Sequence, residues 1–246
     1  MSYKELINGF NHFQEEYKNT AKGKMYKELA ENGQKPETLV IACSDSRIDP
    51  AILTHSAPGE FFAIRNVAAL VPPYKSASVL RGTSSAIEYA VRHLGVKHIV
   101  ILGHAGCGGI QALATGNYRV GNNHNFQFLD RWLGIGQEAK DEVYKKFECS
   151  DDDEKIKVLE QASIIVSMNN LLSFPWIKDK CERKEILIHG WYFDMLNAEL
   201  FEYCLAEEQF KPIEQTDTNH SYLTNLQSLE KFLESYTRTC PCHAGN

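Results

Sequence analysis

The amino-acid sequence predicts an α/β protein with a mainly parallel four-stranded central sheet, an added antiparallel edge strand, flanking helices and an N-terminal helical arm. Two observations carry this prediction. The strongest apolar segments are short and nearly continuous, as in parallel strands that are buried on both faces. A segment with helical spacing lies between the second and third of them, as in a strand, crossover helix, strand unit. The four predicted strands are residues 38–42, 60–64, 98–102 and 184–189.

The predicted helices are defined by apolar residues at intervals of three and four. Leu6, Phe10, Phe13 and Tyr17 share one helical stripe before any strand signal, and they predict the N-terminal arm. The crossover segment ends at Gly95, a residue type that commonly closes helices. The predicted helices after the arm are residues 83–94, 108–115, 126–147 and 151–172, with a last amphipathic stretch over 223–233.

Aromatic residues after the fourth strand predict a hairpin at the edge of the sheet. Residues 191–193 and 200–203 are separated by polar residues, and their pairing would add the antiparallel strand. From Gln209 onward the sequence turns polar. We therefore expect a single domain with a helical arm over residues 1–35, an α/β core over 36–208, and a C-terminal helical extension and tail over 209–246.

Composition limits the partners of this protein. The chain has 246 residues and 43% hydrophobic side chains, enough for a substantial core. Its formal net charge of −6 argues against nucleic acid, because phosphates attract a basic surface. Residues 1–18 contain no apolar signal core and no apolar run could cross a bilayer, so we expect a cytoplasmic protein with no membrane contact. Seven cysteines, an odd number, predict thiols that are free or metal-bound.

Cysteine and histidine side chains follow two of the predicted strands. Cys43 comes directly after the first strand, whereas His104 and Cys107 follow the third. Because the carboxyl ends of parallel strands converge where ligands bind, these side chains are expected to meet. Thiolate and imidazole are preferred zinc ligands, and three protein ligands leave a fourth position for water or substrate. The alternative is a buried structural cysteine beside a helix-capping histidine.

A carboxylate and a guanidinium follow the first candidate ligand at alternate positions. In an extended segment, Cys43, Asp45 and Arg47 would lie on the same side of the backbone. Arg47 would hold the Asp45 carboxylate through bidentate hydrogen bonds and keep it ionised and oriented. The alternative is an ordinary surface ion pair.

Two motifs together resemble the paired motifs of the beta-class carbonic anhydrases. They are residues 43–47 (CSDSR) and 103–109 (GHAGCGG), and the similarity runs in register over about residues 30–205. The resemblance implies one zinc ion per chain, held by Cys43, His104 and Cys107, with Asp45 and Arg47 as the catalytic dyad. It leaves two roles for Asp45, which in the family either accepts a hydrogen bond from zinc-bound hydroxide or becomes the fourth zinc ligand.

The plant-like branch of the family also implies the residues of a substrate pocket. Gln34, Phe62 and Tyr89 fall on its pocket positions, although they could also be a solvated loop residue and two core aromatics. Val67 would add a wall, and the Gly108 backbone N–H could approach a substrate oxygen closely. Because another branch carries a tryptophan where this chain has Val40, an inhibitory bicarbonate site is not expected.

The expected activity is the zinc-dependent, reversible hydration of carbon dioxide to bicarbonate and a proton, by attack of zinc-bound hydroxide. The resemblance further implies a homodimer or homotetramer with the active site near the subunit interface. Two alternatives keep the same site: a hydrolase of carbon disulfide or carbonyl sulfide, and a noncatalytic zinc-binding scaffold.

Two glycine-rich or cysteine-rich segments admit other interpretations. Residues 103–109 could be a phosphate-binding loop, but they lack the spacing of the nucleotide-binding motifs. Cys240, Cys242 and His243 could bind a second metal or form a redox pair, although a chain terminus is more often mobile.

Overall fold

Six strands form one sheet in the computed structural model, which describes residues 1–18, 20–75, 81–116, 127–213 and 223–239. The spatial order is β2-β1-β3-β4-β5-β6. The first four strands in that order are parallel, and β5 and β6 are added antiparallel. The strands are β1 Thr38–Cys43, β2 Phe61–Asn66, β3 His98–His104, β4 Leu187–Asp194, β5 Glu199–Cys204 and β6 Gln209–Pro212. This arrangement confirms the predicted α/β class with a mainly parallel sheet.

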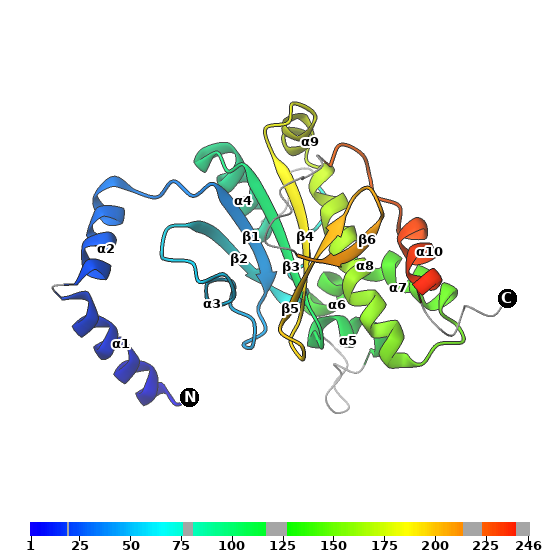
Figure 1. Ribbon diagram of the computed structural model, residues 1–246, viewed down its shortest axis with the longest axis horizontal. Coiled ribbons are helices and arrows are strands. Elements are labelled where there is room, and N and C mark those ends of the chain that lie inside the picture. The colour runs from blue at the N-terminus through cyan, green and yellow to red at the C-terminus, as the bar shows by residue number, and fades with distance from the viewer. Residues whose placement is uncertain (19, 76–80, 117–126, 214–222, 240–246) are drawn as a thin grey trace.

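Most helices pack against one face of this sheet, α3 lies against the other face, and α1 and α2 extend away from it (Figure 1). The crossover predicted between β2 and β3 is present, and it continues as a π-helical turn over Tyr89–Leu94 that ends at Gly95. The helices are α1 Tyr3–Tyr17, α2 Ala21–Asn32, α3 Pro50–Thr54, α4 Gly82–Glu88, α5 Gly108–Thr115, α6 Gln127–Leu133, α7 Gln137–Lys146, α8 Asp152–Leu172, α9 Pro175–Glu182 and α10 Leu229–Thr239.

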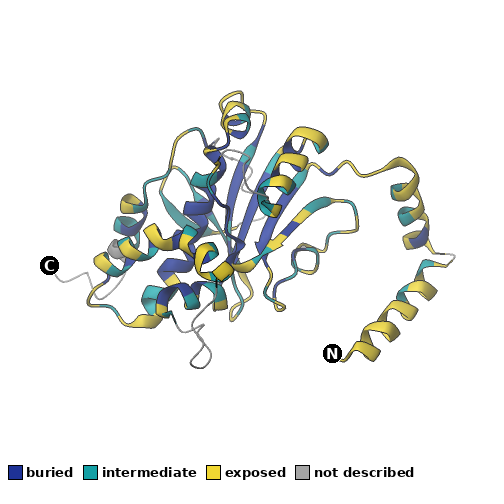
Figure 2. Ribbon diagram, turned by 180° about the vertical axis from the view of Figure 1, so that it is seen from behind, coloured by how far each residue is buried: buried dark blue, intermediate teal, exposed yellow. Residues whose placement is uncertain are grey.

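The central strands are buried on both faces, which explains their continuous apolar runs. Ile99 and Ile101 of β3 pack into the main core with the helices, while Val100 and Leu102 point into a smaller cluster on the other face. This second cluster is completed by α3 and by half-buried side chains of β4 and β5. Figure 2 shows the buried centre of the sheet and the exposed arm.

The structure corrects three details of the predicted elements. Residues 191–193 pair antiparallel with residues 200–202 of β5, which confirms the predicted hairpin, but they belong to the carboxyl-terminal half of β4 and do not form a separate strand. The single helix expected over 126–147 is divided into α6 and α7 by a 3₁₀ turn at Gly134–Gly136, because glycine weakens a helix interior. Strand β6 was not predicted, since its four residues carry no clear alternation.

The N-terminal arm consists of α1 and α2. Helix α1 buries none of its residues against this chain, and Leu6 and Phe10 are exposed. The division into arm, core and extension remains a prediction, although β6 continues the sheet beyond residue 208.

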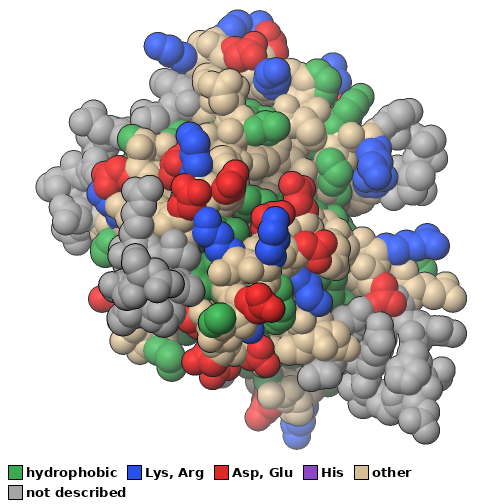
Figure 3. Space-filling model, turned by 90° about the vertical axis from the view of Figure 1, so that its right-hand side faces the viewer, with side chains coloured by type: hydrophobic (Ala, Val, Ile, Leu, Met, Phe, Trp, Pro, Cys, Tyr) green, Lys and Arg blue, Asp and Glu red, His purple; other side chains and the backbone are tan. Residues whose placement is uncertain are grey.

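The surface carries charges of both signs. Figure 3 shows acidic and basic side chains interspersed on the side of the molecule that carries α10. None of the described helices combines the length and the apolar character that crossing a bilayer requires.

We predict that Gly190→Ala destabilises the fold, because α8 packs closely against Gly190 of β4. An added Cβ would lie 2.6 Å from the Met168 sulfur and 2.9 Å from Cγ2 of Ile164. The free energy of unfolding should fall by about 1–3 kcal/mol, as for overpacked cores. Urea denaturation followed by circular dichroism measures the change.

Gly9→Ala is the matched control, because no atom lies within 4 Å of an added Cβ on this exposed helix. It should not lower stability, since alanine favours a helix interior over glycine. Equal stability of Gly190→Ala and the wild type would contradict the packing described for β4.

Candidate metal centre

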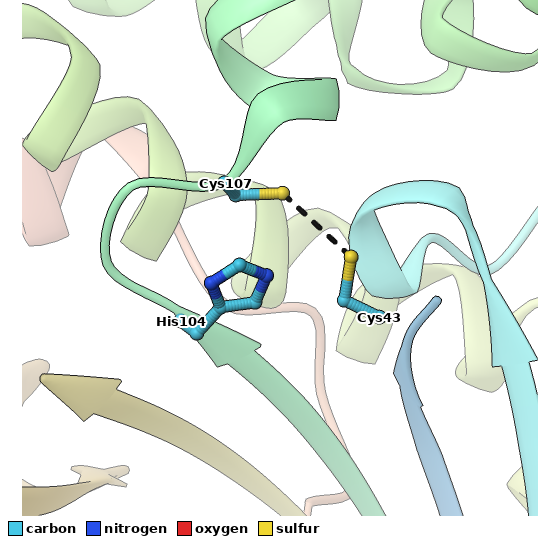
Figure 4. Close-up of side chains that lie close together, drawn as sticks. All are labelled: Cys43, His104 and Cys107. Carbon is cyan, nitrogen blue, oxygen red and sulfur yellow. Dashed lines mark hydrogen bonds between the residues drawn. The ribbon is translucent and has the colours of Figure 1, made fainter. Parts of the chain in front are cut away.

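Two neighbouring parallel strands place the candidate metal ligands at one edge of the sheet. Cys43 is the last residue of β1, and His104 is the last residue of β3. The two strands pair directly, so their carboxyl ends lie side by side. Cys107 follows as the N-cap of α5. Figure 4 shows the three side chains pointing toward one another, and their ligand atoms all lie within 4.8 Å of one another.

The His104 ring has one nitrogen available for a metal. Its Nδ1 lies 3.0 Å from the Ala105 carbonyl oxygen, which can only accept, so Nδ1 carries the hydrogen and donates it. Nε2 is therefore unprotonated in the neutral ring. It is buried, and no hydrogen bond from the described residues reaches it. A backbone carbonyl that fixes the tautomer in this way is the usual support of a metal-binding histidine.

The two thiols form a tightly coupled pair whose Sγ atoms are 3.9 Å apart. The hydrogen bond with the Cys107 thiol lowers the pKa of Cys43, against the opposing effect of burial. The same bond, together with burial, raises the pKa of Cys107. The Asp45 backbone N–H also reaches Cys43 Sγ, at 3.4 Å. Cys43 is therefore set up as a thiolate.

These donors fit a zinc ion. Two sulfur atoms, each about 2.3 Å from a tetrahedral zinc ion, would lie about 3.8 Å apart. The observed separation of 3.9 Å agrees with that value. The unpaired, buried Nε2 of His104 completes a set of one imidazole and two thiolates. Among the described residues, this is the only group of three or more potential metal ligands whose ligand atoms lie close together.

Asp45 and Arg47 are joined beside this group. Arg47 Nε donates to one Asp45 oxygen at 2.9 Å, and Nη2 donates to the other at 2.6 Å. The hydrogen bond from Arg47 holds the pKa of Asp45 far below its usual range. Asp45 Oδ2 is 4.0 Å from His104 Nε2, so the carboxylate borders the ligand set without belonging to the group of three. Its role as a fourth ligand remains a prediction.

Arg65 fixes the loop that carries this pair. Its Nε donates to the Cys43 carbonyl oxygen at 3.1 Å, and its Nη2 donates to the carbonyls of Asp45 at 2.7 Å and Ile48 at 2.5 Å. These contacts lie about twenty residues away in sequence, so no local sequence pattern predicts them. Arg65 holds in place a turn whose shape the sequence alone does not specify.

A strained segment lies against Cys43 on the β2 side. Ala68 and Ala69 adopt left-handed backbone angles, with φ of 65° and 52°, which cost energy for residues with a Cβ. The Ala68 backbone lowers the pKa of Cys43 further through a hydrogen bond. Trp132 Nε1 donates to the Val67 carbonyl oxygen at 2.8 Å and so supports the segment from α6. Sequence patterns give no signal for this strain.

The predicted pocket residues have different surroundings. Val67 is exposed near the ligands and lines a hollow of about 900 Å³ together with Trp132. Phe62 and Tyr89 pack against each other with ring centroids 5.7 Å apart. Gln34 is exposed in the link between α2 and β1. No described hydrogen bond or ring contact joins Phe62, Tyr89 or Gln34 to the three ligands within this chain.

Gly108 begins α5 and has an exposed backbone. An added Cβ there would meet no atom within 4 Å, so close packing does not require glycine at this position. At Gly109 the Cβ would lie 2.8 Å from Val67 Cγ1 and 3.1 Å from Ala68 Cβ. Close packing therefore requires glycine at position 109, which was not among the predicted site residues. The cysteines and histidine of the tail, residues 240–243, lie outside the described residues.

Known proteins share both this fold and this sequence pattern. A family model described as carbonic anhydrase matches residues 38–200. The chain is 37% identical over 173 residues to beta carbonic anhydrase 5, chloroplastic, of Arabidopsis thaliana, a match that covers 70% of this chain and 56% of that protein. It is 36% identical over 176 residues to beta carbonic anhydrase 6, mitochondrial, of the same plant, covering 72% and 59%. The matches thus span less than two thirds of either relative.

Solved structures agree. The beta-carbonic anhydrase CcaA superposes with a TM-score of 0.80 at 27% identity, over 90% of this chain and 95% of that one. One of two tetrameric beta-carbonic anhydrases from Sordaria macrospora gives a TM-score of 0.66 at 29% identity, over 81% and 94%.

The fold and the site define an α/β protein with a Cys-His-Cys metal centre at the carboxyl edge of a parallel sheet. Within that class, the chain belongs to the beta-class carbonic anhydrase family, because the family model covers more than half of it and its structural relatives carry that name. The resemblance drawn from the two motifs is confirmed.

We predict that Gly109→Ala weakens metal binding. Its Cβ would displace the Val67–Ala68 segment, whose backbone supports Cys43. Lost support of a ligand typically costs about 10-fold to 100-fold in affinity, so zinc should be lost more readily to a chelator. Atomic absorption after dialysis measures the retained metal. Gly108→Ala, with open space around its Cβ, should retain zinc as the wild type does. Equal retention by both variants would show that the contact is unimportant.

Proposed function

We propose that this protein catalyses the reversible hydration of carbon dioxide to bicarbonate and a proton, with one zinc ion per chain. The observation that carries the proposal is the Asp45 carboxylate, gripped on both oxygens by Arg47 at the border of the Cys-His-Cys group. A purely structural metal site would need no such oriented carboxylate. Membership of the family supports the same reaction.

Cys43, His104 and Cys107 would hold the metal, and a bound zinc ion supplies acidity that generates a nucleophile from water near neutral pH. Asp45 contributes orientation. Because Arg47 keeps its pKa low, Asp45 stays ionised and can only accept a hydrogen bond. It would therefore accept the O–H of the attacking nucleophile and direct a lone pair toward the substrate carbon. Arg47 prevents the carboxylate from turning away.

The uncharged substrate calls for a small apolar pocket with a few donors. Val67 and Asn66 line a hollow next to the strand that pairs with β1, and we propose that the substrate approaches the metal from this side. We assign Val67, Phe62 and Tyr89 to the pocket walls and the Gly108 backbone N–H to a substrate oxygen. Gln34 is proposed as an amide donor.

The first test is stopped-flow measurement of carbon dioxide hydration with a pH indicator. Zinc-loaded wild type should accelerate the reaction, whereas Asp45→Ala and Arg47→Ala should each keep one zinc and lose about 100-fold in turnover, as expected when a reacting group is misplaced. Zinc content is measured on the same samples. A wild type that gives no acceleration would sink the proposal and leave the carbon disulfide or carbonyl sulfide substrates to be assayed.

The exposed pair Asp179 and Arg183 provides matched controls. Arg183 Nη2 lies 2.8 Å from Asp179 Oδ2 at the carboxyl end of α9, and the pair has the same chemistry as the proposed dyad. Alanine at either position should leave turnover unchanged, because exposed ion pairs contribute little. A loss equal to that of the Asp45 and Arg47 variants would mean that the assay reports general destabilisation.

We also propose that the protein is a homodimer or homotetramer with the active site near the subunit interface. Helix α1 leaves Leu6, Ile7 and Phe10 exposed and has no fully buried residue. Gln34, a proposed pocket residue, lies in the exposed link that follows the arm, where it could face a neighbouring copy. The Sordaria macrospora relatives are described as tetrameric.

Phe10→Asp should reduce the oligomer mass measured by light scattering after size-exclusion chromatography. The reason is that Phe10 belongs to the apolar stripe of α1, and a buried charge without a partner is costly. Asn11→Asp introduces the same charge at the next position, outside the stripe, and should leave the mass unchanged. An unaltered mass for Phe10→Asp would exclude the arm from the interface.

The proposed location is the cytoplasm. Cys149, Cys181 and Cys204, the described cysteines outside the metal centre, form no disulfide, as is usual in a reducing compartment. The two Arabidopsis relatives are described as chloroplastic and mitochondrial, which concerns those proteins.

A further inference from the structure

A buried carboxylate contacts the backbone of one candidate metal ligand. Glu160 belongs to α8 and is only 4% exposed. The proposed reaction assigns it no role. Burying a carboxylate is costly unless hydrogen bonds compensate it, so the contacts of Glu160 indicate what it stabilises.

Both oxygens of Glu160 accept hydrogen bonds. The Cys107 backbone N–H donates to Oε1 at 2.9 Å, and the Tyr192 hydroxyl donates to Oε2 at 2.9 Å. Tyr192 is itself buried on β4, and Glu160 accepts the only described hydrogen bond of its hydroxyl. Tyr192 therefore fixes the carboxylate, and the carboxylate in turn holds the backbone of a candidate metal ligand.

The peptide group that Glu160 holds also contacts the proposed dyad. The N–H of Cys107 and the C=O of Gly106 belong to one planar unit. Arg47 Nη2 donates to that Gly106 oxygen at 2.8 Å. The dipole of this peptide thus has an anion at its positive end and a cation at its negative end. Both contacts are charge-assisted, which makes them about twice as strong as neutral hydrogen bonds.

We propose that Glu160 is a positioning residue whose charge, oriented by Tyr192, fixes the Gly106–Cys107 peptide and thereby sets both the Cys107 thiolate and the Arg47–Asp45 pair. The part that concerns Cys107 depends only on metal binding. The part that concerns Arg47 and Asp45 rests on the proposed function. One peptide then couples the ligand set to the group that orients the nucleophile.

Glu160→Gln tests the charge while preserving the shape. The glutamine oxygen can still accept from Cys107, and its amide can donate to the Tyr192 hydroxyl. Zinc should leave the variant about 10-fold to 100-fold faster in the presence of a chromogenic chelator. With Co²⁺ as the probe, its thiolate charge-transfer and d–d bands should shift from those of the wild type, because the Cys107 ligand is displaced.

Tyr192→Phe is a second test variant, and Ser163→Ala is the control. Tyr192→Phe removes one donor to Glu160 and should change zinc release in the same direction, by a smaller factor. Ser163 lies on the same helix, is buried, and its hydroxyl has no hydrogen-bond partner among the described residues. Ser163→Ala should therefore leave zinc release and the cobalt spectrum unchanged.

The coupling to Arg47 is tested by a double-mutant cycle on kcat/KM. Arg47→Ala and Glu160→Gln should cost less together than the product of their separate losses, since both act through one peptide. Losses that simply multiply would overturn the proposed link.

The proposal is also overturned if Glu160→Gln releases zinc as the wild type does, or if Ser163→Ala matches its effect. If Glu160→Gln does not fold, Tyr192→Phe is the test. A Tyr192→Phe variant that releases zinc at the wild-type rate overturns the proposal. Metal release and cobalt spectra need no substrate. If the wild type does not hydrate carbon dioxide, the proposed function is wrong, but the zinc-release test of Glu160 is still valid.

Discussion

The parallel pairing of β1 with β3 is the constraint on which the metal centre depends. Adjacent strands lie about 4.8 Å apart, so residues that end neighbouring parallel strands are brought within reach of a common ion. Cys43 and His104 occupy those ends, and the turn after β3 returns Cys107 to the same point. The pairing is held by the burial of apolar residues on both faces of the strands. Ligand spacing is thus a direct product of core packing.

This constraint explains what the sequence could predict. Buried parallel strands are continuous apolar runs, and each ends where polar or ligand residues begin, so Cys43 and His104 could be placed at strand ends. The chemistry of thiolate and imidazole then indicated zinc. The fourth strand was also predicted, but its end was placed too early, at residue 189. In the structure β4 continues through residues 191–193, which still pair with β3. Local pattern gives the existence of an element more reliably than its boundaries.

What the sequence could not give are contacts between distant segments. Arg65 contacts a turn at residues 43–48, Glu160 contacts Cys107, and Trp132 contacts Val67, each through a backbone group. Backbone groups are the same at every residue, so no side-chain pattern marks them as partners. Glu160 does give a signal in the sequence, since it is the only charged residue between Val158 and Leu172 of α8. A buried charge inside such a helix is a signal that deserves a search for its partner.

Groups of opposite charge alternate along one row of hydrogen bonds across the site. The sequence of groups runs from the Glu160 carboxylate through the Gly106–Cys107 peptide to the Arg47 guanidinium and then to the Asp45 carboxylate. Each group contacts an opposite charge or dipole, which for the buried Glu160 offsets the cost of removing its charge from water. Two thiolates would cancel the formal charge of a zinc ion and leave it a weaker acidifier of water than three neutral ligands would. In the proposed mechanism, such a site gains more from an accurately oriented Asp45 than from acidity of the metal alone, and the proposed role of the Glu160–peptide–Arg47 chain is to maintain that orientation.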